Sequence, residues 1–221
     1  MVLLIHHSIS PQSRKARIMM AEKKALLVLK EEEPWNLSKE LKKLNPAADL
    51  PVLVFDGHVI SGNYAVTEYI EENYPQPCLL KGDARHRAEM RRLCDWFDQK
   101  FYHEVYQYIV GEKVFKRFKL RQAPDSKILK AGLNNLKFHM EYIDWLSERN
   151  NNLAGREFSL ADITAAAHLS VIDYLGDIEW GNYKNAKLWY SKIKSRPSFK
   201  EILKDTIKGI PPSKHYQNLD F

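Results

Sequence analysis

The sequence predicts two domains, a small α/β domain followed by an all-helical domain. Strand-like segments occur within the first 61 residues, where they alternate with helical patterns, and every later segment repeats its apolar residues at helical spacing. Pro75 and Pro77 separate the two parts, because proline disfavours helical conformation in the residue before it. We place the domains at residues 1–76 and 83–208, with a linker at 77–82 and an extended tail at 209–221.

The first domain is expected to form a small mixed sheet with helices packed against it. Its strands are expected at residues 2–6, 25–29, 52–55 and 58–60, and its helices at 11–23, 36–44 and 63–72. The first two strands are apolar without alternation, which is typical of buried strands. Asp56 and Gly57 lie between the last two strands, and this pair favours a type I′ hairpin turn.

The second domain is expected to be a helical bundle. One face of its longest helix carries Met90, Leu93, Cys94, Phe97, Phe101, Val105 and Tyr108. Further helical patterns cover residues 128–146, 159–175 and 186–194, and Pro197 opens a last short helix. Ser159 and Asp162 match the capping-box pattern, so we expect them to start the helix at residues 159–175 in a structural role.

The composition excludes several classes of protein. The 221 residues include 34 Lys and Arg against 28 Asp and Glu, a formal net charge of +6, and the two signs are interleaved. Such a mild excess does not predict a nucleic-acid-binding protein. No run of about 18 apolar residues occurs, so we expect no membrane span. Cys78 and Cys94 cannot form a disulfide framework, which indicates a reducing compartment and a cytoplasmic location.

The distribution of cysteine and histidine limits the chemistry. Residues 1–77 contain no cysteine, so a cysteine-based redox reaction in the first domain would lack its nucleophile. His139 and His168 have no second ligand at metal-binding spacing. We therefore expect both histidines to be hydrogen-bonded or solvated, and we expect no metal site.

Three motifs occur in a characteristic order along the chain. They are Ser10-x-x-Ser13-Arg14-x-x-Arg17, Asn45-Pro46-Ala47-x-x-Leu50-Pro51-Val52-Leu53, and Ser159-Leu160-Ala161-Asp162 followed by Arg196-Pro197-Ser198-Phe199. With these motifs and this order of elements, the chain resembles the glutathione S-transferase superfamily from end to end. The resemblance implies a thioredoxin-like N-terminal domain, a C-terminal helical bundle and a cleft between them.

Ser10 is the candidate catalytic residue. It matches the position at which serine-type members of this superfamily hydrogen-bond the glutathione sulfur. A hydroxyl beside the positive end of a helix can favour a thiolate over a thiol. Serine at this position is also an ordinary helix N-cap, and the sequence leaves both interpretations open. Ser13 is the second candidate hydroxyl.

The resemblance assigns the rest of a glutathione site to two loops. Leu50, Pro51 and Val52 match the loop in which the superfamily carries a cis-proline, after which the backbone of Val52 pairs with the cysteinyl part of glutathione. The start of the next helix departs from the pattern. Gly62-Asn63 stands where glutathione-binding members have an acidic residue followed by Ser or Thr. The carboxylate that pairs with the γ-glutamyl ammonium is therefore missing, and we expect weakened glutathione affinity.

A closer resemblance lies within the superfamily. The segments that carry it are Glu32-Glu33-Pro34-Trp35, Ser61-Gly62-x-x-Ala65, Ala186-Lys187-Leu188-Trp189-Tyr190 with the following residues to Phe199, and Pro211-Pro212-x-x-His215-Tyr216-x-x-Leu219-Asp220-Phe221. These segments resemble the bacterial transferase-like proteins that bind the tubulin-like division protein FtsZ. The resemblance implies a homodimer with partner-binding residues at Trp35, Tyr216, Asp220 and Phe221.

Two functions remain open at this point. The first is a non-catalytic dimeric adaptor of cell division that binds FtsZ filaments and requires no cofactor. The alternative is a serine-type transferase that conjugates glutathione to a small electrophile, with Ser10 stabilising the thiolate. In either case glutathione is a possible ligand, weak in the first and a cosubstrate in the second. The departure at Gly62 and the apolar C-terminal tail favour the adaptor.

Overall fold

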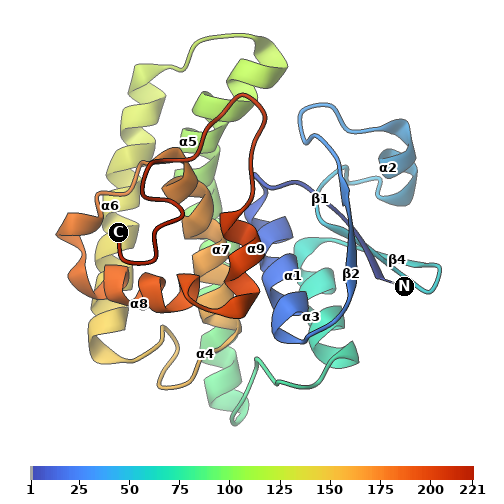
Figure 1. Ribbon diagram of the computed structural model, residues 1–221, viewed down its shortest axis with the longest axis horizontal. Coiled ribbons are helices and arrows are strands. Elements are labelled where there is room, and N and C mark those ends of the chain that lie inside the picture. The colour runs from blue at the N-terminus through green and yellow to red at the C-terminus, as the bar shows by residue number, and fades with distance from the viewer. Residues whose placement is uncertain (1) are drawn as a thin grey trace.

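The computed structural model, which describes residues 2–221, places a four-stranded mixed sheet beside a bundle of helices (Figure 1). The strands are β1 (Val2–His6), β2 (Leu27–Glu31), β3 (Val52–Phe55) and β4 (His58–Ser61), in the order β2-β1-β3-β4. Strand β1 runs parallel to β2 and antiparallel to β3, and Leu4 lies opposite both Leu29 and Leu53. The predicted element order and fold class are confirmed.

The sheet differs from the expectation at its second strand. Strand β2 lies at the edge, and Val28 and Leu29 are each 44% exposed. The prediction of a buried strand at residues 25–29 is wrong, because the burial of an apolar strand depends on what covers it and not on its composition. The hairpin prediction holds, since Asp56 and Gly57 both have positive φ, as a type I′ turn requires.

The helices of the first domain are α1 (Pro11–Glu22), α2 (Lys39–Leu44) and α3 (Asn63–Asn73). Helix α2 begins three residues later than expected. Ser38 is its N-cap, with its side chain accepting a hydrogen bond from the backbone N–H of Leu41 at 3.1 Å. Leu41 anchors this helix to the sheet by packing against Ile5 and Val52.

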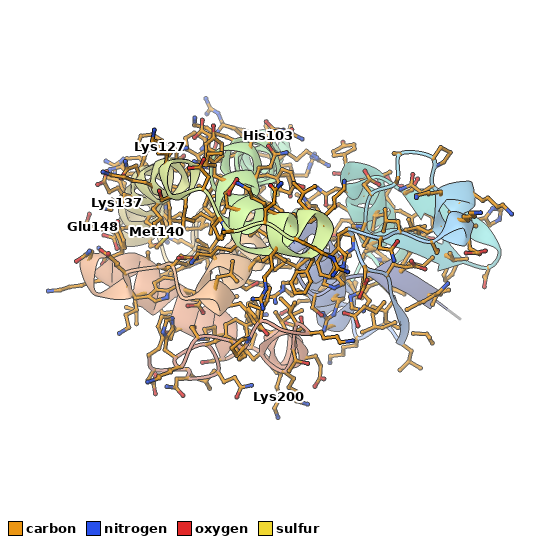
Figure 2. All side chains as sticks on the ribbon, turned by 90° about the horizontal axis from the view of Figure 1, so that it is seen from above. His103, Lys127, Lys137, Met140, Glu148 and Lys200 are labelled. Carbon is orange, nitrogen blue, oxygen red and sulfur yellow. The ribbon has the colours of Figure 1, made fainter. Side chains whose placement is uncertain are left out.

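The second domain begins with one long helical segment. It consists of α4 (Ala84–Asp95), η1 (Trp96–Tyr106), α5 (Gln107–Val110) and η2 (Gly111–Leu120), and η1 and η2 have the wider turns of a π-helix. The remaining elements are α6 (Ser126–Arg149), α7 (Leu160–Leu175), η3 (Trp180–Asn182), α8 (Lys184–Lys194), η4 (Pro197–Phe199) and α9 (Lys200–Leu203). Helix α6 lies on the side of the bundle away from the sheet, where Lys127, Lys137 and Glu148 project (Figure 2).

Helix α7 is the central helix of the bundle, with nearly all of its residues buried. Asp162 fixes its start, because one carboxylate oxygen accepts hydrogen bonds from the backbone N–H and the hydroxyl of Ser159. The other oxygen accepts from the indole of Trp189 at 2.9 Å. The predicted structural role of Ser159 and Asp162 is confirmed.

The two domains share one hydrophobic core, with α1 packed against α7. Four charged residues of α1 reach across the junction. Arg14 bonds Ser170, Lys15 pairs with Asp98, Arg17 with Asp205 and Glu22 with Arg196. The orientation of the sheet relative to the bundle is therefore held by buried ion pairs as well as by apolar contact. None of the helices within residues 2–221 has the length and apolar content that a bilayer crossing requires.

Candidate functional site

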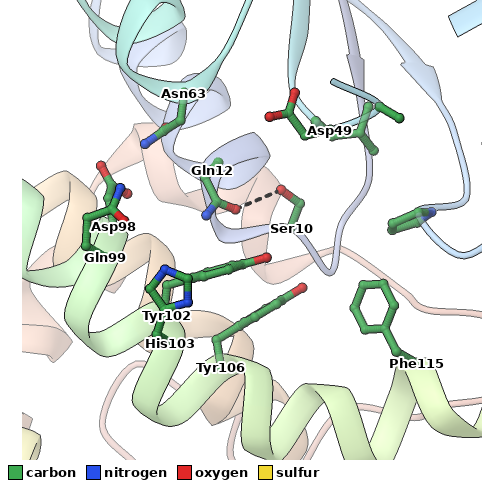
Figure 3. A pocket seen from close by; sticks show the side chains of 13 residues that line it. Ser10, Gln12, Asp49, Asn63, Asp98, Gln99, Tyr102, His103, Tyr106 and Phe115 are labelled. Carbon is green, nitrogen blue, oxygen red and sulfur yellow. Dashed lines mark hydrogen bonds between the residues drawn. The ribbon is translucent and has the colours of Figure 1, made fainter. Parts of the chain in front are cut away.

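A cavity of about 350 Å³ opens where the first domain meets η1 (Figure 3). Its lining combines loop residues of the first domain with side chains of the long helical segment. These residues are Ser10, Gln12, Pro34, Ala48, Asp49, Leu50, Asn63, Asp98, Gln99, Tyr102, His103, Tyr106 and Phe115. The cleft that the resemblance implied is therefore present, and it contains three of the predicted site residues, Ser10, Leu50 and Asn63.

Ser10 serves as the N-cap of α1 and also borders the cavity. Its oxygen accepts a hydrogen bond from the backbone N–H of Ser13 at 3.1 Å, and its hydroxyl donates to Oε1 of Gln12 at 3.3 Å (Figure 3). The hydroxyl proton is therefore directed to a neighbouring side chain. The capping interpretation of Ser10 is confirmed, and whether the hydroxyl also meets a sulfur stays a prediction.

Ser13 does not belong to the site. Its side chain is fully buried, and its oxygen accepts from the backbone N–H of His7 at 3.4 Å. The expectation that Ser13 is a second glutathione-binding hydroxyl is wrong, because this side chain is buried against the backbone of His7 and does not line the cavity.

The proline loop has the expected backbone. The peptide bond between Leu50 and Pro51 is cis, and Leu50 lines the cavity. The side chain of Val52 points away, into a small cluster with Ile5 and Leu41. A ligand in the cavity can therefore meet Val52 through its backbone alone.

The start of α3 lacks the usual anchor. Gly62 is the N-cap position, with a φ of +87° and no side chain to hold a ligand, while Asn63 places its amide at the cavity. Gly62 is not among the lining residues. The first turn of α3 thus presents an amide where an acidic residue and a hydroxyl would bind the γ-glutamyl group.

Two carboxylates that sequence reasoning missed lie in the cavity, Asp49 and Asp98. Asp98 is held from behind by Lys15, with Nζ 2.8 Å from Oδ2, and by His168, with Nε2 3.0 Å from Oδ1. Although burial opposes it, the charge of Lys15 holds the pKa of Asp98 well below its usual range. Among the described lining residues there is no lysine or arginine.

An aromatic wall closes the cavity on the helical side. The rings of Tyr102 and Tyr106 are stacked, with centroids 4.7 Å apart and planes 15° apart, and both project from η1 toward Ser10 (Figure 3). The phenol of Tyr106 donates to the backbone carbonyl of Ile9 at 3.1 Å, so this ring is fixed. Tyr102 and Tyr106 therefore form the wall of the cavity on the side of the helical bundle.

Trp35 lies beside the cavity, in the loop between β2 and α2. Its ring stacks on Phe118 at 4.8 Å and meets Phe115 and His7 edge-on. The side chain is half-buried. Trp35 therefore joins the first domain to η2 and leaves part of its ring accessible.

The C-terminal tail folds back on its own domain. The ring of Tyr216 is fully buried, and its hydroxyl accepts from Arg14 at 2.8 Å and donates to the carbonyl of Ile202 at 3.0 Å. The prediction that Tyr216 contacts a partner is wrong, because its ring is part of the core. Phe221 is half-buried over Lys194, whose Nζ lies 4.0 Å from the ring centroid, while Asp220 is exposed.

His139 and His168, the two histidines expected to be hydrogen-bonded or solvated, form hydrogen bonds with other side chains. Nε2 of His139 lies 3.0 Å from Glu104 and its Nδ1 accepts from the indole of Trp96, and His168 pairs with Asp98. Within residues 2–221, no three His, Cys, Asp or Glu side chains gather as a metal site would require.

Known proteins share the sequence and the fold of this chain. Residues 9–73 match the family model described as the N-terminal domain of glutathione S-transferase. The chain is 44% identical to FtsZ-localized protein A of Caulobacter vibrioides, over 99% of this chain and 97% of that protein. Two solved structures superpose with a TM-score of 0.96. A glutathione S-transferase from Rhodospirillum rubrum is 47% identical with both chains fully covered, and FzlA from C. crescentus is 43% identical over 100% of this chain and 99% of that one. The chain therefore belongs to the glutathione S-transferase superfamily, on the branch that includes FtsZ-localized protein A.

Proposed function

We propose that this chain is a non-catalytic adaptor that binds FtsZ filaments, and that it acts as a cytoplasmic homodimer. The observation that carries the proposal is the similarity over the full chain to a relative whose name places it on FtsZ. That similarity includes the helical domain and the C-terminal tail, which a match to the N-terminal domain alone would not cover.

The charges of the cavity support the same function. Glutathione has two carboxylates and one ammonium, so tight binding calls for cationic or N–H partners. The described lining offers Asp49 and Asp98 and no lysine or arginine. In addition, Ser10 already donates its proton to Gln12. These features disfavour a bound glutathione thiolate.

Two accessible surfaces are candidates for the filament contact. The first surrounds Trp35, whose partly exposed ring stacks on Phe118 beside the guanidinium of Arg117. The second is the end of the tail, where Asp220 is exposed. Both surfaces can be altered without disturbing the ion pairs of the domain junction.

Co-sedimentation with FtsZ polymers tests the proposal. We expect the protein to pellet with polymers and not without them, and we expect Trp35→Ala or Asp220→Lys to reduce the pelleted fraction severalfold. Ser10→Ala should leave pelleting unchanged, and Trp145→Ala, a partly exposed tryptophan on α6, serves as the matched control. Absence of wild-type pelleting would contradict the filament-binding role. Sedimentation velocity tests the proposed homodimer, for which we expect twice the mass of one 25.9 kDa chain.

The alternative of a serine-type transferase is favoured by one observation, the position of Ser10 at the N-terminus of α1 and at the cavity. Calorimetry with glutathione and an assay with a chlorinated aromatic electrophile distinguish the two functions. We expect no saturable binding below the millimolar range and no conjugation above the uncatalysed rate. Conjugation that Ser10→Ala abolishes would establish the transferase instead.

A further inference from the structure

The cavity between the domains differs in charge from the molecule around it. The chain has a formal net charge of +6, yet the cavity is lined by two carboxylates, Asp49 and Asp98, and by no lysine or arginine. His103 also belongs to the lining. An anion entering this cavity loses water without meeting a fixed positive charge, which is unfavourable. The composition of the lining favours a ligand of the opposite sign.

The two carboxylates are not equivalent. Asp98 is compensated within the protein, because Lys15 and His168 occupy both of its oxygens from the side of the core. Asp49 is exposed, and its side chain accepts a hydrogen bond from the amide of Asn45 at 2.6 Å. No lysine or arginine within residues 2–221 forms an ion pair with Asp49, so its negative charge remains available at the cavity.

The aromatic wall lies opposite this charge. Tyr102 offers a ring face to the cavity, and its stacking on the fixed ring of Tyr106 holds it in place (Figure 3). Burial and then the charge of Asp49 raise the pKa of the Tyr102 phenol, which agrees with both groups facing the same space. Cations bind favourably over the faces of such rings.

We propose that this cavity binds a cationic group, either a guanidinium or an alkylammonium, with Asp49 as its counterion and Tyr102 as its aromatic wall. The amide oxygens of Gln12 and Asn63 are the neutral acceptors beside it. The proposal goes beyond filament binding and does not require it. The same chemistry is presented by a free amine and by an arginine or lysine side chain of a protein partner.

A titration followed by ¹⁵N–¹H NMR tests the proposal with two matched probes. N-acetyl-arginine amide carries the cation, and N-acetyl-citrulline amide has nearly the same shape without charge. We expect the arginine probe to shift backbone amides around the cavity and to bind at least tenfold more tightly than the citrulline probe. Asp49→Asn should weaken arginine binding about fivefold, as should Tyr102→Leu. Asp95→Asn is the control, because Asp95 is an exposed carboxylate at the end of α4 that does not line the cavity. This variant should bind the arginine probe as the wild type does.

Equal affinity for the two probes, or an unchanged affinity in Asp49→Asn, would overturn the proposal. The spectrum of each variant shows whether it is folded, so a loss of binding is not confused with a loss of structure. Co-sedimentation with FtsZ in the presence of the arginine probe then identifies the source of the cation. If the arginine probe reduces the fraction of protein that pellets with FtsZ, the cation is a side chain of the filament. If the probe binds and pelleting is unchanged, the cation is a free amine. Because the titration contains no FtsZ, it remains decisive if the filament role fails.

Discussion

Arg14 is the residue whose replacement should damage this protein most clearly. Its guanidinium is fully buried and donates to three groups, the carbonyl of Ser8 at 2.6 Å, the hydroxyl of Ser170 at 2.9 Å and the hydroxyl of Tyr216 at 2.8 Å. These partners belong to the loop before α1, to α7 and to the C-terminal tail. One side chain therefore connects three parts of the chain.

The expected cost of Arg14→Met follows from these contacts. Each hydrogen bond to a charged donor contributes about 1.5 kcal/mol or more, and the loss of three leaves buried acceptors with fewer partners. Removing the buried guanidinium offsets part of this loss, because a charge no longer has to be dehydrated. Asp205 keeps its two-point contact with Arg17. We expect a loss of about 3 kcal/mol in the free energy of unfolding.

Urea unfolding followed by tryptophan fluorescence measures this loss. The matched control is Arg85→Met, because Arg85 is exposed in the first turn of α4, and its replacement should change stability by less than about 0.5 kcal/mol. Increased hydrogen exchange at the amides of the tail should accompany Arg14→Met, since Tyr216 loses a partner. A loss below about 1 kcal/mol, or one equal to that of the control, would refute the assigned role of Arg14.

Three further outcomes are expected. Burial lowers the pKa of His6 and His7 to about 4, below the usual value of about 6.5, so their contribution to stability is complete above pH 6.5 and is lost as the pH falls toward 4. This contribution amounts to at most about 3 kcal/mol for each histidine. In His6→Gln, the free energy of unfolding should therefore change less between pH 6.5 and pH 5 than it does in the wild type. Gly132→Ala should cost about 1–3 kcal/mol in urea unfolding, because the new Cβ would lie 2.6 Å from Cβ of Tyr108. Tyr216→Phe should lower stability by about 1 kcal/mol and leave FtsZ pelleting intact, whereas a pelleting defect without destabilisation would contradict its buried role.

The local features of the fold could be predicted from the sequence because their causes lie within a few residues. Ser10 and Pro11 open α1, and Asp56 with Gly57 turns the hairpin. Two helix boundaries differ from the expectation, for different reasons. Helix α2 begins three residues later than expected because Ser38 supplies its own local cap. Helix α8 begins at Lys184, two residues before the expected start, because the carboxylate of Asp144 on α6 accepts from the backbone N–H groups of Asn185 and Ala186.

The candidate site shows the same division. Its first-domain residues, Ser10, Leu50 and Asn63, belong to recognisable local motifs at helix starts and in the proline loop. Asp49 and Asp98 could not be assigned in advance, since they are far apart in the sequence and the meaning of each depends on its surroundings. Lys15 neutralises Asp98, while Asp49 remains free of such a partner among the described residues.

The sequence by itself determined the order of helices and strands, the absence of cysteine chemistry in the first domain and the loss of the acidic anchor at Gly62. The tertiary structure decided which charges are buried, which carboxylate faces the cavity, and that Tyr216 is a core residue rather than a contact surface. The reason is physical. Backbone preferences act over one or two turns, whereas burial and electrostatic compensation arise only when distant segments such as α1, η1 and the tail are brought together.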